Sequence, residues 1–337
     1  LILTSDIETC ELEVTANGSL TIPATKTFTV KGQVVNNSTS NDFVIANNGI
    51  LLQIDDVENQ GMITVERASS PMYRLDYTIW SSPVSGMLLK DLSNVSISGG
   101  SGTLWNRVYT LGDNVWNQVW ATQQVFESDN TTTFGQAKGY MYRAKNNWVT
   151  RDSGNPGESD LGVFTGVPNN GTISISTPLM FNAIGNPYPS PIDGNDLLGA
   201  GATGLYFWTN TNTPEANGTY LSNNWAYYNQ TGGTGVQIGD VGVPILVPDG
   251  IIQPGQGFVA GTTEDVNQIT FTNEMRMGNN GMFFRQMSHE RHRFWLNLSD
   301  EMAVYNQILV GYMENATQGA DSGIDAKMFA YEGNAIY

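Results

Sequence analysis

Four aromatic side chains flank a long segment rich in Asn, Thr and Gly: Trp208, Trp225, Tyr227 and Tyr228. Exposed aromatic rings with Asn and Asp neighbours are a common means by which β-rich proteins stack on sugar rings. These four residues are therefore our candidate ligand-binding site. The alternative is that they pack in the core or against turns, as large aromatic side chains usually do.

Two short acidic segments carry the oxygen ligands that Ca²⁺ prefers. Asp193 and Asp196 belong to one segment, and Asp321 and Asp325 belong to the other. Neither segment follows the complete calcium-loop pattern that ends in a Glu, and Asx turns are the favoured alternative at both places. We retain these four carboxylates as candidate metal ligands, with Ca²⁺ as the one cofactor considered.

Catalytic patterns are incomplete in this chain. Asp193 and Asp196 are the nearest candidate pair for glycoside hydrolysis, which needs two carboxyl groups about 5–9 Å apart. The segment Gly199–Gly204 has the letters of a dinucleotide-binding loop, but a strand-like segment follows it instead of a helix. His289 and His292 are three positions apart, whereas a zinc-protease helix needs four. We expect no enzyme, and a glycoside hydrolase remains only as a second alternative.

Composition excludes further classes of protein. The chain has 337 residues, 15 Lys and Arg against 32 Asp and Glu, and a net charge of −17. Because this charge repels phosphate backbones and no basic run offsets it, we expect no nucleic-acid partner. No apolar run approaches the ~18 residues of a membrane helix, so we expect no membrane insertion. The single cysteine, Cys10, has no partner for an intramolecular disulfide, so stability must come from packing.

Short strands are the elements that must position these side chains. Apolar residues do not recur at helical spacing over any long segment, whereas short β-branched or aromatic runs alternate with Gly, Asn, Pro and Asp turns. The fold class is therefore all-β. In 1–68 the strand-like runs are closely spaced, and the separations of Ile22, Ile45 and Val65 fit a short β-solenoid or ladder whose inward aliphatic residues stack. A meander of hairpins is the alternative for the same spacing.

An ordered set of motifs occurs twice in the rest of the chain. The first set includes Pro83, Trp116 and Phe164, and the second includes Pro187, Trp225 and Phe271 at offsets near 100 residues. We expect two related β-sandwich-like modules, 69–166 (module 1) and 167–275 (module 2). A further strand set in 276–337 is expected to begin another β-module that continues beyond this sequence. No Lys or Arg occurs between Asp152 and Met275, so module 2 is strongly acidic.

The stretch Ile184–Asp193 contains three prolines at alternate positions after a Gly-Asn pair. This stretch resembles the secreted, multi-domain cell-surface proteins of Flavobacterium-type Bacteroidota, which are exported by type IX secretion. Further stretches resemble that family in the same order along the chain: 75–84, 138–140, 205–209, 255–258, 283–285, 293–298, 309–312 and 319–326.

The resemblance implies an extracellular location on the outer-membrane surface of a Gram-negative bacterium. It also implies partners in the outer-membrane secretion and anchoring machinery, reached through a C-terminal sorting domain that we expect beyond Tyr337. We therefore expect a non-catalytic structural or adhesin-like surface module. A carbohydrate-binding module is the first alternative, with surface polysaccharide or other surface proteins as its partners.

Overall fold

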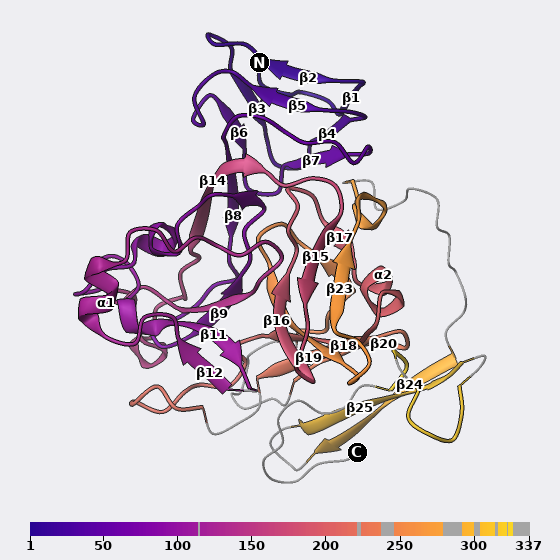
Figure 1. Cartoon of the computed structure of the whole chain (residues 1–337). Coiled ribbons are helices and arrows are strands. Elements are labelled where there is room, and N and C mark those ends of the chain that lie inside the picture. Colours follow the sequence, from indigo (N-terminus) through magenta and orange to yellow (C-terminus); the bar gives the residue numbers. More distant parts are fainter. Residues whose placement is uncertain are drawn as a thin grey trace.

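The computed structural model describes 1–113, 115–220, 224–236, 246–278, 292–299, 304–313, 316–321 and 323–325. Strands dominate it and the helices are short, so the expected all-β class with sandwich-like sheets is confirmed. A narrow stack of strands lies at one end, two broader sheet structures lie side by side below it, and a two-stranded hairpin lies at the other end (Figure 1). No helix among the described residues is long and apolar enough to cross a membrane.

The N-terminal segment forms a β-solenoid with three parallel ladders. The ladders are β1 (Ile7–Thr9), β4 (Thr27–Val30) and β7 (Ile50–Gln53); β2 (Leu12–Val14) and β5 (Val34–Asn36); and β3 (Leu20–Ile22), β6 (Phe43–Ile45) and β8 (Ile63–Ala68). A meander of hairpins would pair its strands antiparallel, so the parallel pairing shows that this segment is a solenoid and excludes the meander. Ile22 lies opposite Ile45, and Ile45 lies opposite Val65, as their spacing predicts.

The solenoid coils turn tightly because glycine allows close backbone approach at a corner. Gly61 has a φ of +82°, and a Cβ there would lie 1.9 Å from the carbonyl oxygen of Asn36. Inside the coils, Ile22, Val30 and Phe43 are completely buried. One continuous core then extends from the solenoid into module 1, from Leu3 to Phe164.

Module 1 has two facing sheets. One contains β9 (Tyr77–Trp80), β11 (Val108–Gly112), β12 (Val115–Gln118) and β13 (Tyr140–Arg143), in the spatial order β12-β11-β13-β9. The other contains β14 (Leu161–Pro168), which pairs antiparallel with β8 on one side and with β10 (Val84–Ser85) on the other. Since β8 also belongs to the solenoid ladder, the sheet runs without a break from the solenoid into module 1.

Module 2 repeats this arrangement. Its larger sheet has the order β16-β22-β18-β19-β20, and two strand pairs, β15-β23 and β17-β21, accompany it. The bounds are β15 (Ile173–Ser176), β16 (Phe181–Gly185), β17 (Ile192–Asp193), β18 (Ala202–Trp208), β19 (Trp225–Asn229), β20 (Gly232–Thr234), β21 (Ile251–Ile252), β22 (Gly257–Thr262) and β23 (Gln268–Phe271).

The two modules share one strand order. In both sheets the first strand along the chain lies at one edge, the last strand pairs with it, and the second and third strands follow: β9-β13-β11-β12 in module 1 and β16-β22-β18-β19 in module 2. The module 2 sheet has one further strand, β20, next to β19. The repeated aromatic residues lie in equivalent strands, with Trp116 in β12 and Trp225 in β19, and with Phe164 in β14 and Phe271 in β23. The duplicated sequence pattern therefore corresponds to duplicated topology.

Short helices and a hairpin complete the described structure. The helical pieces are α1 (Gln123–Ser128), α2 (Gly194–Gly199) and the 3₁₀ turns η1 (Leu89–Asn94), η2 (Trp105–Arg107), η3 (Arg151–Ser153) and η4 (Asn273–Met275). Within the expected third module, β24 (His292–Ser299) and β25 (Val304–Tyr312) form an antiparallel hairpin. His289 of the rejected zinc pattern lies outside the described residues, and His292 begins β24.

Candidate functional site

The structure buries half of the predicted aromatic site. Trp225 is 4% exposed and Tyr228 is 3% exposed, so the expectation of an exposed ring platform is wrong for these two residues. Trp225 packs edge-to-face against Trp208 with ring centroids 5.1 Å apart. Both rings belong to a cluster with Ile79 and Met141 of module 1, which means that they fill the junction between the modules. Trp208 and Tyr227 are half-buried.

The first predicted carboxylate pair has a local structural role. The Asp193 carboxylate accepts hydrogen bonds of 2.8 Å from the backbone N–H and from the side-chain amide of Asn195, and so caps the start of α2. Asp196 lies in the first turn of the same helix, where its negative charge suits the helix dipole. This is the helix-cap chemistry that Asx residues commonly provide at a turn.

The second pair stabilises a turn at the edge of a cavity. The Asp321 carboxylate accepts a 2.8 Å hydrogen bond from the Thr317 hydroxyl, and the Asp325 carboxylate accepts one of 2.8 Å from the Asp321 backbone N–H. Both aspartates line a cavity of about 400 Å³ together with Glu264. Among the described residues no group of three or more Asp, Glu, His or Cys side chains is arranged to hold a metal ion.

The two modules meet through equivalent backbone groups. The Ser81 N–H donates to the Gly255 carbonyl at 2.9 Å, and the Gly185 N–H donates to the Ala137 carbonyl at 2.9 Å. Ser81 comes directly after β9 and Gly185 ends the equivalent strand β16, while the acceptors Gly255 and Ala137 lie shortly before the equivalent strands β22 and β13, so the junction has an approximate two-fold relation. Close approach explains the glycine, because a Cβ on Gly185 would lie 2.3 Å from the Ser81 Cβ.

A buried arginine joins the solenoid to module 2. The Arg276 guanidinium lies over the Tyr188 ring at 4.8 Å and donates to the Leu51 carbonyl at 2.7 Å, to the Ser190 hydroxyl at 2.8 Å and to the Asn170 side chain at 2.6 Å. Burial lowers the pKa of Arg276 to about 9. The Leu51 N–H donates back to the Pro189 carbonyl at 3.0 Å. The proline-rich stretch is thus a buried contact between solenoid and module 2.

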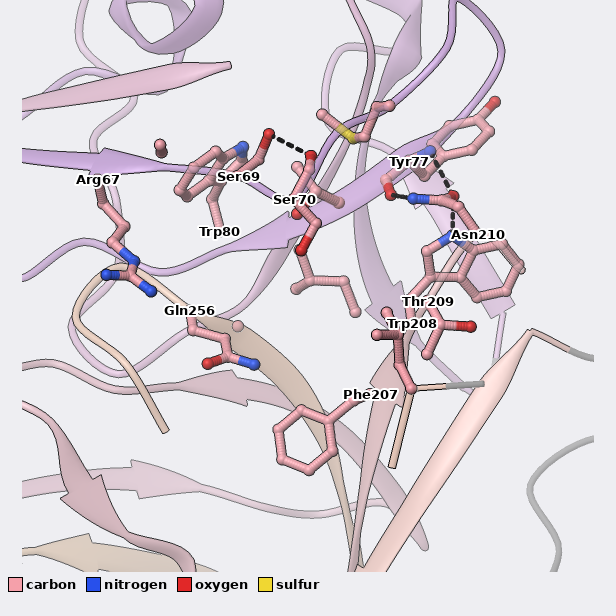
Figure 2. Close-up of a pocket in the computed structure, with 16 residues that line it drawn as sticks. Arg67, Ser69, Ser70, Tyr77, Trp80, Phe207, Trp208, Thr209, Asn210 and Gln256 are labelled. Atoms are coloured by element: carbon pink, nitrogen blue, oxygen red, sulfur yellow. Dashed lines mark hydrogen bonds between the residues drawn. The ribbon is translucent and has the colours of Figure 1, made fainter. Parts of the chain in front are cut away.

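A cleft opens beside the module junction (Figure 2). Its volume is about 160 Å³, and side chains from both modules and from the end of β8 line it. Figure 2 shows the Arg67 guanidinium and the Gln256 carboxamide on one side, with Trp208 and Tyr77 on the other and Phe207 between them. Of the four predicted aromatic residues, only Trp208 lines this cleft.

Asn210 organises the far wall of the cleft. Its backbone has a φ of +54°, and its side-chain oxygen accepts hydrogen bonds from the Trp208 indole N–H at 2.6 Å and from the Tyr77 N–H at 3.0 Å. Its amide donates to the Tyr77 carbonyl at 2.7 Å. Sequence reasoning missed Asn210 and Arg67, since nothing local distinguishes one Asn in an Asn/Thr-rich loop or one Arg at a strand end.

The model of a protein family described as a domain of unknown function, DUF8693, matches residues 2–337. The chain therefore belongs to this family. No curated protein matches the chain, and no solved structure matches it.

Proposed function

We propose that this member of the DUF8693 family is a non-catalytic, structural and adhesin-like module of an extracellular protein on the surface of a Gram-negative bacterium. Type IX secretion is the proposed export route, with outer-membrane anchoring machinery as the proposed partner. The resemblance of 184–193 and the related stretches to Bacteroidota surface proteins supports this route. The light, acidic charge suits modules that must stay soluble and apart when presented at high density.

One observation carries the structural part of the proposal: the three parts of the chain are joined by buried bonds. β8 pairs with both solenoid and module 1, reciprocal backbone bonds join the modules, and Arg276 joins module 2 to the solenoid. Domains connected by flexible linkers usually move relative to one another, whereas a continuous sheet and buried contacts resist that motion. The chain is suited to act as a stiff spacer or display element.

Surface labelling tests the proposed location. The native protein carries an epitope tag, and whole cells are treated with protease in strains with an intact or a disabled type IX translocon. We expect cleavage of the tagged protein only where the translocon is intact. Equal surface exposure in both strains would remove type IX export from the proposal, while a protease-resistant protein in intact cells would remove the surface location.

Carbohydrate binding is the second candidate function, and the cleft is the observation that favours it. Trp208 and Phe207 provide apolar ring surface beside the amide of Gln256, the combination that sugar sites use. Glycan-array screening of the purified chain, with and without EDTA, tests this function and any need for Ca²⁺. A saccharide hit would support the candidate, and a blank array would remove it.

A further inference from the structure

A cation, Arg67, lines the cleft of this strongly acidic protein. The chain carries 32 carboxylates, yet none of the described residues that line the cleft is an Asp or a Glu. The described part of the chain holds two ion pairs, Lys145 with Asp160 and Arg151 with Asp76. Arg67 takes part in neither of them. A cation in such a place attracts an anion, because desolvation is costly until an opposite charge compensates it.

Arg67 has unused hydrogen-bonding capacity. A guanidinium has five N–H donors, and in the described residues the one recorded bond of Arg67 runs from Nη1 to the Asn48 side-chain oxygen. Burial lowers the pKa of Arg67. Arg276 provides the contrast, since its guanidinium is bonded to Leu51, Ser190 and Asn170. All three guanidinium nitrogens of Arg276 donate to protein acceptors, whereas Nε and Nη2 of Arg67 are left with donors that a planar carboxylate would match.

Gln256 adds a directed donor to the same side of the cleft. Its side-chain oxygen accepts a 3.0 Å hydrogen bond from the Gln253 backbone N–H, which orients the carboxamide. The amide NH₂ is then the group available for a ligand hydroxyl. Trp208 on the opposite side is held by its bond to Asn210, so its ring has a defined position before any ligand arrives. Preorganised groups of this kind lower the entropic cost of binding.

A peptide fits this cleft poorly. Strand β9 is the edge of its sheet, and an extended peptide would have to pair with that edge. The edge is already occupied, because Asn210 binds both backbone groups of Tyr77 and the Gly255 carbonyl accepts from the Ser81 N–H. The side chains that line the cleft, and not free backbone groups, therefore determine which ligand can bind there.

We propose that the cleft binds a uronic acid residue of an acidic polysaccharide, with its carboxylate on the Arg67 guanidinium and a hydroxyl on the Gln256 amide. The sugar ring lies towards Trp208 and Phe207. The cavity of about 160 Å³ is smaller than the ~300–1,000 Å³ pockets of drug-sized ligands, so it has room for a single sugar residue at the end of a polysaccharide. This inference rests on the carbohydrate-binding candidate and adds the charge of the ligand to it.

The test is a titration of the intact chain with sodium glucuronate, glucose and sodium acetate, followed by NMR and calorimetry. We expect glucuronate to bind at least about tenfold more tightly than either glucose or acetate, because a charge-assisted bidentate contact is stronger than a neutral one. Arg67→Gln should remove that preference. Lys31→Gln, which removes the same charge from an exposed position on the solenoid, should leave it unchanged.

Other results would contradict the uronate proposal. Equal binding of glucose and glucuronate would overturn the uronate proposal and leave carbohydrate binding standing, whereas the absence of any sugar binding would overturn both. Acetate as tight as glucuronate would reduce the site to a carboxylate site without sugar recognition. If Arg67→Gln fails to fold, the wild-type spectra decide: the Trp208 indole N–H must shift with glucuronate, and an unchanged signal contradicts the proposal.

Discussion

Modules 1 and 2 have the same strand order but are attached to the solenoid in different ways. Module 1 shares strand β8 with the solenoid, so the sheet itself is the connection. The equivalent strand of module 2, β15, pairs with β23 alone among the described strands, and hydrogen bonds attach the module to the solenoid instead. Arg276 donates to the Leu51 carbonyl, and the side-chain amides of Asn170 and Asn273 both donate to the Asp55 carbonyl. The comparison shows that a duplicated module can be fixed in place by long-range hydrogen bonds, most of them from side chains, where its sibling uses strand pairing.

Substituting the two equivalent tryptophans should reveal the largest difference in stability between the modules. Trp225 is 4% exposed at the junction, while its counterpart Trp116 is half-buried near the end of its sheet. We expect Trp225→Ala to reduce the free energy of unfolding by about 3–5 kcal/mol, since it leaves a large cavity. Trp116→Ala should cost clearly less. Urea unfolding followed by circular dichroism measures both, and equal losses would contradict the asymmetric packing.

Removing the arginine contact should loosen module 2 selectively. Arg276→Met leaves the Leu51 carbonyl and two side-chain acceptors without their donor, and we expect a loss of about 2–3 kcal/mol, partly offset by relief of the buried charge. Hydrogen exchange should accelerate in 170–173 and 186–191 and stay slow in β14. Uniform acceleration in both modules would show that Arg276 is not a separate attachment of module 2.

The glycine at the module junction offers a sharper test of the two-fold relation. Gly185→Ala should destabilise the chain by about 1–3 kcal/mol, because the new methyl group meets Ser81 at 2.3 Å. Adding Ser81→Gly to this variant should recover part of the loss, because the side chain at the junction then comes from module 2 instead of module 1. Gly199→Ala is the matched control, since open space surrounds that position and no loss is expected. A harmless Gly185→Ala would contradict the close approach.

Raising the pH should produce the smallest of these losses of stability. We expect almost no loss in the neutral range and a growing loss at alkaline pH. Burial raises the pKa of Tyr77 to about 12 and also raises the pKa values of Tyr188 and Tyr206. The stability that these tyrosines contribute is complete below their ordinary pKa of about 10 and is lost as pH rises above it. Arg276 acts in the opposite direction, because its lowered pKa of about 9 favours folding as pH rises. Because three tyrosines act against this one arginine, we expect tyrosinate absorbance and loss of circular dichroism to rise together above pH ~10; tyrosinate formation without unfolding would contradict this account.

The sequence predicts the regular parts of the fold better than the contacts between them. Parallel coils stack like residues at similar intervals, so the spacing of Ile22, Ile45 and Val65 predicts their register in a solenoid, but the same spacing also suits a meander of hairpins. The aromatic pattern around Trp225 identifies a strand but not its burial, because the same residues suit a core and a sugar platform. The contact of Arg276 with Leu51 spans 225 positions, and no local pattern encodes such a distance.

The distance between the solenoid and module 2 tests the central claim of a stiff, joined unit most directly. Cys10 is a free, exposed cysteine on the solenoid, and Gly199→Cys places a second one on module 2 at an exposed position with open space around it. Spin labels at both sites report the distance distribution by pulsed electron paramagnetic resonance. The account predicts one narrow distribution that broadens in Arg276→Met. A broad or two-peaked distribution in the otherwise unaltered chain would contradict it.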